Sequence, residues 1–220
     1  MKTGSIQSAS EASSKTLHIA SLPVTLPAKS SASSIQIASL LEQIQSITRK
    51  AEKLVHGRSN EDLTWKSDAA AWSVAECLDH LAQTTQVFLG PIAHAVAEAP
   101  ALTSDRPLRT GTLARLFIRN LEPPYRLRFK VLPQLTPSHR DFQSAWSGFL
   151  TSQSDLQQAV RSATGLAIDR VKIKSPVYAR IAYNIYGALR MLAAHERRHL
   201  WQIEQILAVI DVSRSRSKAR

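Results

Sequence analysis

The stretch His195-Glu196-Arg197-Arg198-His199 lies near the middle of the longest helical pattern in this sequence. Apolar residues recur along one face of that pattern at the spacing of an α-helix, and they are Tyr186, Leu189, Ala193, Leu200, Ile203, Leu207 and Ile210. We therefore predict a single helix over about Ala179–Val212. On this helix His195 and His199 lie four residues apart on one face, where two imidazoles can bind one metal ion.

The letters of this stretch, H-E-x-x-H, also form the signature of zinc proteases. Those enzymes take their third metal ligand from a residue that follows the second histidine. Only 21 residues follow His199, and Glu204 and Asp211 are the only acids among them. Glu204 would point away from both histidines on the helix. A third ligand must therefore come from an earlier part of the chain, which argues against a zinc protease.

The second helical pattern has the clearest start. In Trp72-Ser73-Val74-Ala75-Glu76, Ser73 is a candidate N-cap, and Glu76 three residues later completes a capping box. The pattern continues to about Glu98, and Pro91 inside it predicts a kink or a division of the helix.

Two other helices are predicted from apolar spacing alone. One covers about Ile35–Leu54, with Ser34 as its candidate cap, and the other covers Ser138 to about Ser162. A long crossover precedes the latter and contains a short helical pattern at Leu113–Asn120. A short extended piece is predicted at Val171–Lys174.

These patterns predict an all-α fold. The chain has only seven glycines, its hydrophobic share is 44%, and no alternating strand pattern or internal repeat is present. The fold we predict is an antiparallel four-helix bundle with a long crossover between helices two and three.

Composition divides the chain into three parts. Residues 1–34 are rich in Ser and Ala and are predicted to be a disordered leader, and residues 35–212 are the bundle domain. Residues 213–220 carry four Lys or Arg and no acid, so we predict a basic tail. The formal net charge of +11 is thus concentrated partly at the ends. The tail is either solvated or in contact with an anionic partner.

Cys77 is the only cysteine, so no internal disulfide can form and a reducing compartment is expected. We interpret Cys77 as a small apolar helix residue, with a nucleophile as the alternative. The longest apolar runs are far shorter than a membrane span. We therefore expect a cytoplasmic protein that does not enter a membrane.

A third histidine, His80, is a candidate partner for His195 and His199. It lies one turn after Glu76 at the edge of the core stripe of the second helix, where it could face the last helix. Three histidines from two helices would hold a metal on one side and leave the other side open. The alternative is that His80 is an ordinary boundary residue whose nitrogens are satisfied by other groups.

Two segments resemble motifs of the DinB-like superfamily. Trp72-Ser73-Val74-Ala75-Glu76-Cys77-Leu78-Asp79-His80-Leu81 is similar to its second-helix motif, and Ala194-His195-Glu196-Arg197-Arg198-His199-Leu200-Trp201-Gln202 is similar to its last-helix motif. The resemblance extends from about Ile35 to Val212. It implies a four-helix bundle that holds a divalent metal on three histidines, here His80, His195 and His199.

The resemblance also implies chemistry and partners. The metal would be nickel, zinc, iron or manganese. Better understood relatives are transferases and isomerases that use small cytosolic thiols such as bacillithiol or mycothiol, others are described as metal-dependent hydrolases, and homodimers are common. We therefore predict an enzyme that transfers a small thiol to, or hydrolyses, a small-molecule electrophile, and we expect a homodimer. The alternative is a non-enzymatic bundle that binds metal or another protein.

Two residues beside the histidines are also assigned roles. Glu196 is predicted to act as a base on a metal-bound water, with a surface ion pair to Arg197 as the alternative. Gln202 falls on the stripe of His195 and is predicted to orient a ligand or His199, with a helix-packing amide as the alternative.

The crossover is strongly basic. Between Asp105 and Arg140 eight basic residues accompany two acids, and the basic ones are Arg106, Arg109, Arg115, Arg119, Arg126, Arg128, Lys130 and Arg140. If the crossover covers the site, it could hold an anionic co-substrate; a solvated loop is the alternative. Nucleic acid is not an expected partner, because no aromatic interleaving or known reader motif accompanies this charge.

Overall fold

The computed structural model describes residues 31–123, 125, 131–138, 141–178 and 180–218. Residues 1–30 of the predicted leader therefore lie outside the described residues. Among the helices that are described, none is both long enough and apolar enough to cross a membrane.

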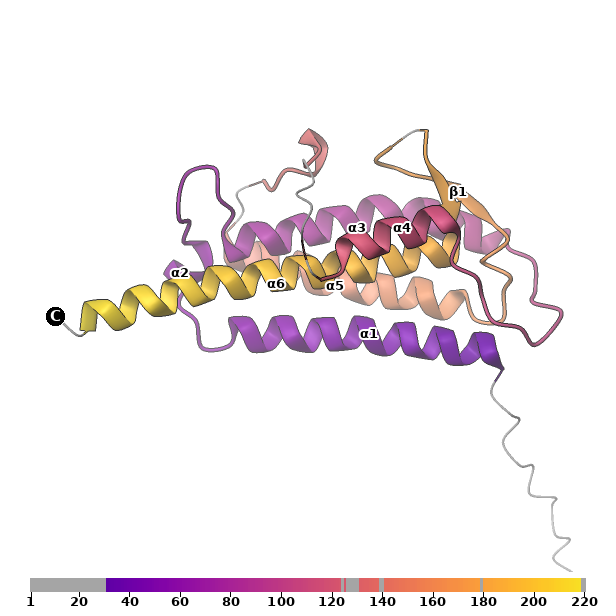
Figure 1. Cartoon of the computed structure of the whole chain (residues 1–220), viewed down its shortest axis with the longest axis horizontal. Helices are drawn as coiled ribbons and strands as arrows, with labels where there is room; N and C mark the ends of the chain where they lie inside the picture. Colours follow the sequence, from indigo (N-terminus) through magenta and orange to yellow (C-terminus); the bar gives the residue numbers. More distant parts are fainter. Residues whose placement is uncertain (1–30, 124, 126–130, 139–140, 179, 219–220) are drawn as a thin grey trace, which may run out of the picture.

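Four long helices form the body of the molecule, and they are α1 (Ala32–Val55), α3 (Val74–Ala97), α5 (Phe142–Ser162) and α6 (Ile185–Lys218). Figure 1 shows that α1 and α6 run in one direction and that α3 and α5 run in the opposite direction. The long crossover between α3 and α5 returns the chain along the bundle, so these two helices can point the same way. The predicted four-helix bundle with a crossover between its second and third helices is confirmed.

The core lies where these four helices meet. α3 packs against α5 and α6, and α1 contacts α5 and α6 in turn. Leu78 of α3, Phe149 of α5 and Leu200 of α6 have no solvent exposure. Because apolar stripes face inward on α3 and α6, residues at the edges of the two stripes come close together.

The start of α3 follows the predicted capping box. Ser73 Oγ accepts a hydrogen bond of 3.1 Å from the Glu76 backbone N–H, and the Glu76 carboxylate accepts one of 2.8 Å from the Ser73 N–H. Lys66 Nζ donates to the same carboxylate at 3.0 Å. These contacts fix the first turn of α3, one turn before His80.

Shorter elements fill the connections: α2 (Asn60–Thr64), α4 (Thr112–Leu121), the 3₁₀ turn η1 (Pro133–Leu135), β1 (Lys172–Lys174) and β2 (Ala182–Asn184). α4 corresponds to the short helix predicted in the crossover, and β1 to the predicted extended piece. α2 and η1 were not predicted, because each is too short to show an apolar period.

The last helix begins later than predicted, at Ile185 instead of Ala179. The reason is that β2 pairs with β1 in an antiparallel register that places Ile173 opposite Tyr183. The other end of α6 extends past Val212 into the predicted tail, as far as Lys218.

Ion pairs from the segment that follows α1 support this extension of α6. Arg58 pairs with Asp211, and Arg214 Nη2 lies 2.6 Å from a carboxylate oxygen of the buried Asp62. Part of the predicted tail is therefore a helix bound to the bundle.

The structure differs from three other predictions at helix positions. Pro91 does not divide α3, which continues to Ala97, and Phe88 and Ile92 on either side of it are buried in the core while Pro91 itself is exposed. The kink, the other alternative, stays a prediction. The N-cap of α1 is Ser31 instead of Ser34, since Ser31 Oγ accepts from the Ser34 N–H at 3.1 Å. The cap of α5 is likewise Asp141, which shortens the helix predicted from Ser138.

Gly187 allows α4 to pack closely on α6. A Cβ atom at this position would lie 2.7 Å from Ala114 Cβ and 2.8 Å from Asn184 Oδ1, which accepts the Gly187 N–H. We expect Gly187→Ala to lower the free energy of unfolding by about 1–3 kcal/mol, measured by urea denaturation. Gly90→Ala, in open space on α3, should instead raise it by about 0.5–1 kcal/mol. Equal midpoints for the two variants would show that α4 is not held against α6.

Candidate metal centre

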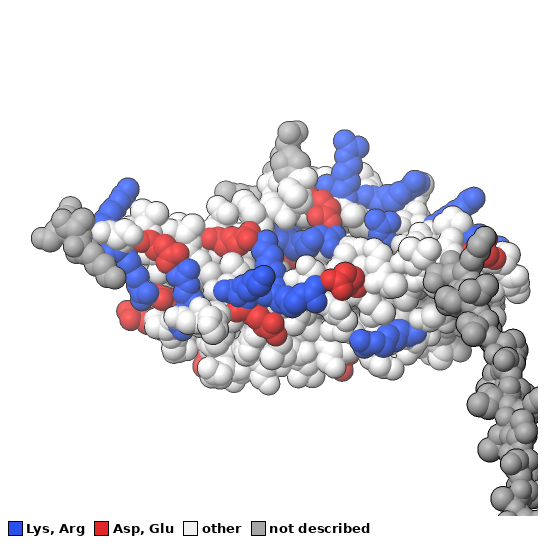
Figure 2. Space-filling model, turned by 90° about the horizontal axis from the view of Figure 1, so that it is seen from below, with Lys and Arg blue, Asp and Glu red and all other residues white. Residues whose placement is uncertain are grey.

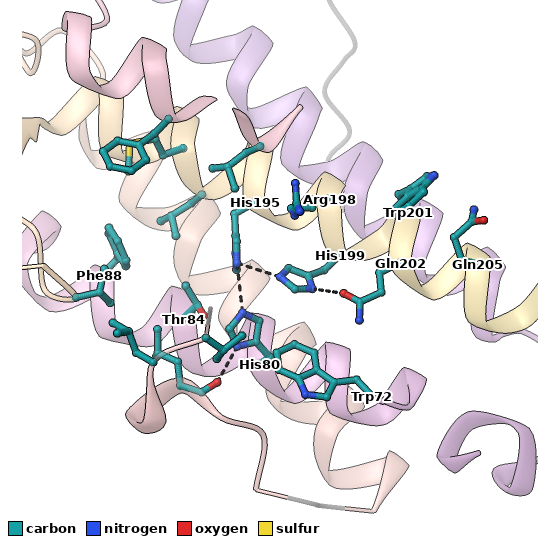
Figure 3. Close-up of a pocket in the computed structure, with 18 of the residues that line it drawn as sticks. Trp72, His80, Thr84, Phe88, His195, Arg198, His199, Trp201, Gln202 and Gln205 are labelled. Carbon is teal, nitrogen blue, oxygen red and sulfur yellow. Dashed lines mark hydrogen bonds between the residues drawn. The ribbon is translucent and has the colours of Figure 1, made fainter. Parts of the chain in front are cut away.

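His80 is buried on α3 and directed at α6. Its Nδ1 donates a hydrogen bond of 2.7 Å to the carbonyl oxygen of Leu135, the last residue of η1. Because a carbonyl oxygen can only accept, this contact assigns the proton of the neutral ring to Nδ1. The lone pair of His80 Nε2 therefore remains available on the side that faces α6 (Figure 3).

His195 and His199 project from α6 toward His80. His195 Nε2 lies 3.3 Å from His80 Nε2 and 3.1 Å from His199 Nε2. One ligand atom from each of the three side chains lies within 4.8 Å of the other two. The structure thus brings together the three histidines that the sequence selected, as Figure 3 shows.

The three Nε2 atoms cannot all satisfy one another by hydrogen bonds. The Gln202 amide oxygen accepts from His199 Nδ1 at 3.0 Å, so His199, like His80, presents a lone pair at Nε2. A single proton on His195 Nε2 can serve only one of these two acceptors. A shared divalent cation could accept all three lone pairs at once, so the donor set fits a metal ligated by imidazole.

The electrostatic environment keeps these rings neutral. Burial lowers the pKa of His80, and burial together with the neighbouring His80 lowers the pKa of His195 to about 3. The pKa of His199 is well below its usual value, first because of burial and then because of the two other rings. Neutral imidazole is the form that ligates a metal, so the site is suited to ligation at neutral pH.

Trp72 forms one wall of the histidine cluster. Its ring centroid lies 4.9 Å from that of His80, and it stacks on His199 with centroids 5.8 Å apart. In the sequence, Trp72 stands only beside a helix cap, and no role at the site was predicted for it. The sequence signal that could have indicated this role is the position of Trp72 directly before the capping box, one to two turns ahead of His80.

This contact makes Trp72 a reporter of metal binding. We expect Ni²⁺ to quench tryptophan fluorescence, because an open-shell ion close to an indole shortens its excited state. Trp72→Phe should lose most of this quenching. Trp146→Phe should keep it, since Trp146 lies between Phe142 and Phe149 in the helix core. Undiminished quenching in Trp72→Phe would place the ion elsewhere.

The crossover is fastened to α3 beside His80. Asp79 Oδ2 accepts hydrogen bonds from the Ser138 N–H at 2.8 Å and from Ser138 Oγ at 2.9 Å. This anchor lies three residues after Leu135, whose carbonyl orients His80. The crossover therefore positions a site residue, a role that the apolar pattern of the sequence did not reveal.

The family model of the DinB superfamily matches residues 43–203. The chain belongs to the DinB superfamily. No curated protein matches it. Among solved structures it is similar to YfiT from Bacillus subtilis, described as "a probable metal-dependent hydrolase with an unusual four-helix bundle topology". The identity is 14%, the TM-score is 0.54, and the match covers 84% of this chain and 94% of that one, which establishes a shared fold.

In this DinB superfamily protein the histidine cluster opens into a cavity of about 820 Å³. Besides the three histidines, its walls include Trp65, Trp72, Phe88, Phe117, Met191, Leu192, Ile206 and Val209. A volume of this size is typical of sites for small organic molecules. Gln202 lines the cavity as well as contacting His199, so the structure places it where the sequence analysis expected. Its predicted role in orienting a ligand or His199 stays a prediction.

Glu196 faces the helix core in this DinB bundle. It has no solvent exposure, and its Oε1 accepts hydrogen bonds from Gln153 at 2.7 Å and from Thr85 at 3.3 Å. Burial raises its pKa to about 7. The alternative of a surface ion pair is therefore wrong. Glu196 is not among the residues that line the cavity, and its predicted role as a base stays a prediction.

Thr48 extends the contacts of Glu196 to α1. Its hydroxyl donates to the Gln153 amide oxygen at 3.3 Å, and Gln153 in turn contacts Glu196. Thr48, Thr85, Gln153 and Glu196 are thus connected by hydrogen bonds, and each comes from a different one of the four long helices.

The crossover lines part of the cavity with apolar residues, namely Phe117, Leu121, Val131, Leu132 and Leu135, but not with its described arginines. Arg106 forms a bidentate pair with the buried Asp169, which also accepts the Arg109 N–H. None of the four crossover arginines that the structure describes lines the cavity, namely Arg106, Arg109, Arg115 and Arg119. The other four basic residues, Arg126, Arg128, Lys130 and Arg140, lie outside the described residues.

Charges of both signs are mixed on the face seen from below in Figure 2. Ion pairs link Arg49 with Glu42, Lys50 with Glu204, and Arg197 with Glu122. Over much of this face the excess of basic residues is therefore offset locally by acids.

Cys77 has no solvent exposure, and burial raises the pKa of its thiol. These observations agree with its interpretation as a small apolar helix residue.

Proposed function

We propose that this protein is a metal-dependent enzyme that holds a divalent ion on the Nε2 atoms of His80, His195 and His199. We further propose that it transfers a small thiol to, or hydrolyses, a small-molecule electrophile bound in the adjoining cavity. Imidazole ligands suit zinc, nickel and iron, and the resemblance to the DinB-like superfamily adds manganese to these candidates.

The convergence of three Nε2 atoms supports this proposal more than any other observation. Two of these atoms present lone pairs, because Leu135 and Gln202 accept the Nδ1 protons of His80 and His199. Such contacts to the far nitrogen are the usual support of metal-ligating histidines. Three protein ligands are also the number found at catalytic metal sites, whereas structural sites take four.

The chain's own residues would hold the ligands and shape the binding space. Leu135 and Gln202 fix the ring orientations, Trp72 covers one side of the cluster, and the apolar cavity walls exclude water from a bound substrate. When bound, the ion would supply Lewis acidity that favours the ionised forms of water and thiols at neutral pH. The description of YfiT as a probable metal-dependent hydrolase supports the hydrolytic alternative.

The proposal is tested by assaying the full chain against a panel of esters, amides, epoxides and halides, each with and without a small thiol. Turnover should disappear after treatment with a chelator and return when a divalent metal is added. Product that contains the thiol would identify a transferase, and product formed without thiol a hydrolase. Stoichiometric metal binding without turnover of any compound would instead favour the non-enzymatic bundle.

A further inference from the structure

The cavity is elongated along α6, with the histidines near its middle. Its lining residues on α6 extend from Met191 to Val209, a distance of about 27 Å at the rise of an α-helix. Figure 3 shows the histidine cluster between Phe88 on one side and Trp72 and Gln205 on the other. A bound molecule that reaches the histidines can therefore extend well beyond them.

The arm on the Phe88 side is apolar. Phe88 lies eight residues after His80 on α3, about 12 Å further along the helix. Its ring stacks on that of Tyr183, with centroids 6.3 Å apart, and Phe117 and Met191 line the same cavity. This arm offers space for a hydrocarbon or aromatic body of moderate length.

Arg198 places a positive charge at this cavity. It is the only Lys, Arg, Asp or Glu among the described residues that line the cavity. Its guanidinium donates to the Asn120 carbonyl oxygen at 3.3 Å and lies over the ring of Tyr125 at 5.3 Å.

Thr84 adds a second polar group at the cavity wall. It lies one turn after His80, is 6% exposed, and its hydroxyl has no hydrogen-bond partner among the described residues. A buried hydroxyl without an acceptor is costly, so an oxygen atom of a ligand would be favoured beside the histidines. Arg198 and Thr84 thus lie near the histidines, and the arm beyond them is lined mainly by apolar side chains and the ring of Tyr183.

We propose that the cavity binds an amphipathic anion whose apolar body fills the arm between Phe88 and Met191 and whose carboxylate pairs with Arg198. This inference rests on the proposed function only in taking that molecule as the electrophilic substrate. The substrate class is then an apolar carboxylic acid that bears the reactive group close to its charged end.

Binding of simple probes to the full chain tests this inference without turnover. The protein is first freed of metal with a chelator, so that the probe cannot bind to an ion. Isothermal titration calorimetry then compares octanoate, 1-octanol and octylammonium. We expect octanoate to bind about tenfold or more tightly than octanol, and octylammonium to bind most weakly. From butanoate to octanoate, affinity should rise about fourfold for each added methylene.

Substitutions assign the charge preference to one residue. Arg198→Met keeps the apolar stem and should bind octanoate and octanol equally, whereas Arg119→Met, exposed on α4 outside the cavity, should keep the preference. Octanoate preference that survives in Arg198→Met would overturn the assignment to Arg198. Equal binding of octanoate and octanol to the wild type would overturn the anionic class, and lack of chain-length dependence would overturn the apolar arm.

Different measurements would contradict the proposed metal-dependent function and the proposed binding of an amphipathic anion. The comparison of probes on the wild type requires no variant, so a folding defect in Arg198→Met leaves it intact. Loss of metal binding or turnover would count against the proposed function while the probe affinities stayed as expected.

Discussion

Replacing His195 with alanine is expected to reduce metal content from one ion per chain to a small fraction of that value. His195 Nε2 lies within 3.3 Å of the Nε2 atoms of both His80 and His199. Its removal leaves only these two histidines, on different helices, to bind the ion. Loss of one ligand from a three-histidine set should weaken binding on the order of a hundredfold or more. Elemental analysis of purified protein and competition with a chromogenic chelator measure both quantities. His80→Ala and His199→Ala should behave in the same way.

Matched variants make this result specific. His94→Ala removes an exposed histidine that pairs only weakly with Glu98 on the far part of α3, and it should keep full metal content. Gln202→Leu should weaken binding about tenfold, because it removes the oxygen that accepts from His199 Nδ1 but leaves all three histidines in place. Full metal occupancy in His80→Ala and His199→Ala would remove the site assignment.

Glu196→Ala is expected to lower the free energy of unfolding by about 2–4 kcal/mol. The change leaves the Gln153 amide N–H and the Thr85 hydroxyl without their acceptor and creates a cavity beside fully buried residues. Urea denaturation at constant pH measures the effect. Glu52→Ala on the exposed surface of α1 is the matched control and should change stability by no more than about 0.5 kcal/mol.

Glu196→Gln separates the structural role of this residue from the predicted catalytic one. The amide keeps an oxygen that accepts from Gln153 and Thr85, so the fold should be retained, and unchanged turnover would leave Glu196 with a structural role alone. A general base in the reaction would instead lose about 10²–10⁴-fold in rate on this substitution. A loss of that size, in a variant with unchanged stability, would make Glu196 a base despite its position in the core.

The fold and the histidine set could be read from local signals in the sequence. The Ser73–Glu76 capping box fixes where α3 starts, and the apolar stripe of α6 fixes which face carries His195 and His199. Together these signals placed His80 at the edge of a stripe that faces the other two, because helical phase is accurate over a few turns.

Other parts of the site depend on contacts between segments far apart in the chain, which no local pattern encodes. Leu135 contacts His80 through a backbone carbonyl, so its side chain gives no signal. The start of α6 was misplaced because the pairing of β2 with β1 overrides the helical propensity of Ala182–Asn184. The surface ion pair considered for Glu196 was wrong, because contacts with Thr85 on α3 and Gln153 on α5 hold this carboxylate in the core.

The 115 residues that separate His80 from His195 affect how the protein is made. A nascent chain emerging from the ribosome presents His80 long before His195 and His199. Until α6 has docked on the bundle, the chain offers a metal ion at most the two histidines of α6, which bind it weakly. If the ion binds as proposed, its high-affinity capture would therefore follow folding. The free energy of capture then adds to the native state alone, so starvation for the ion would lower the melting temperature of the mature protein.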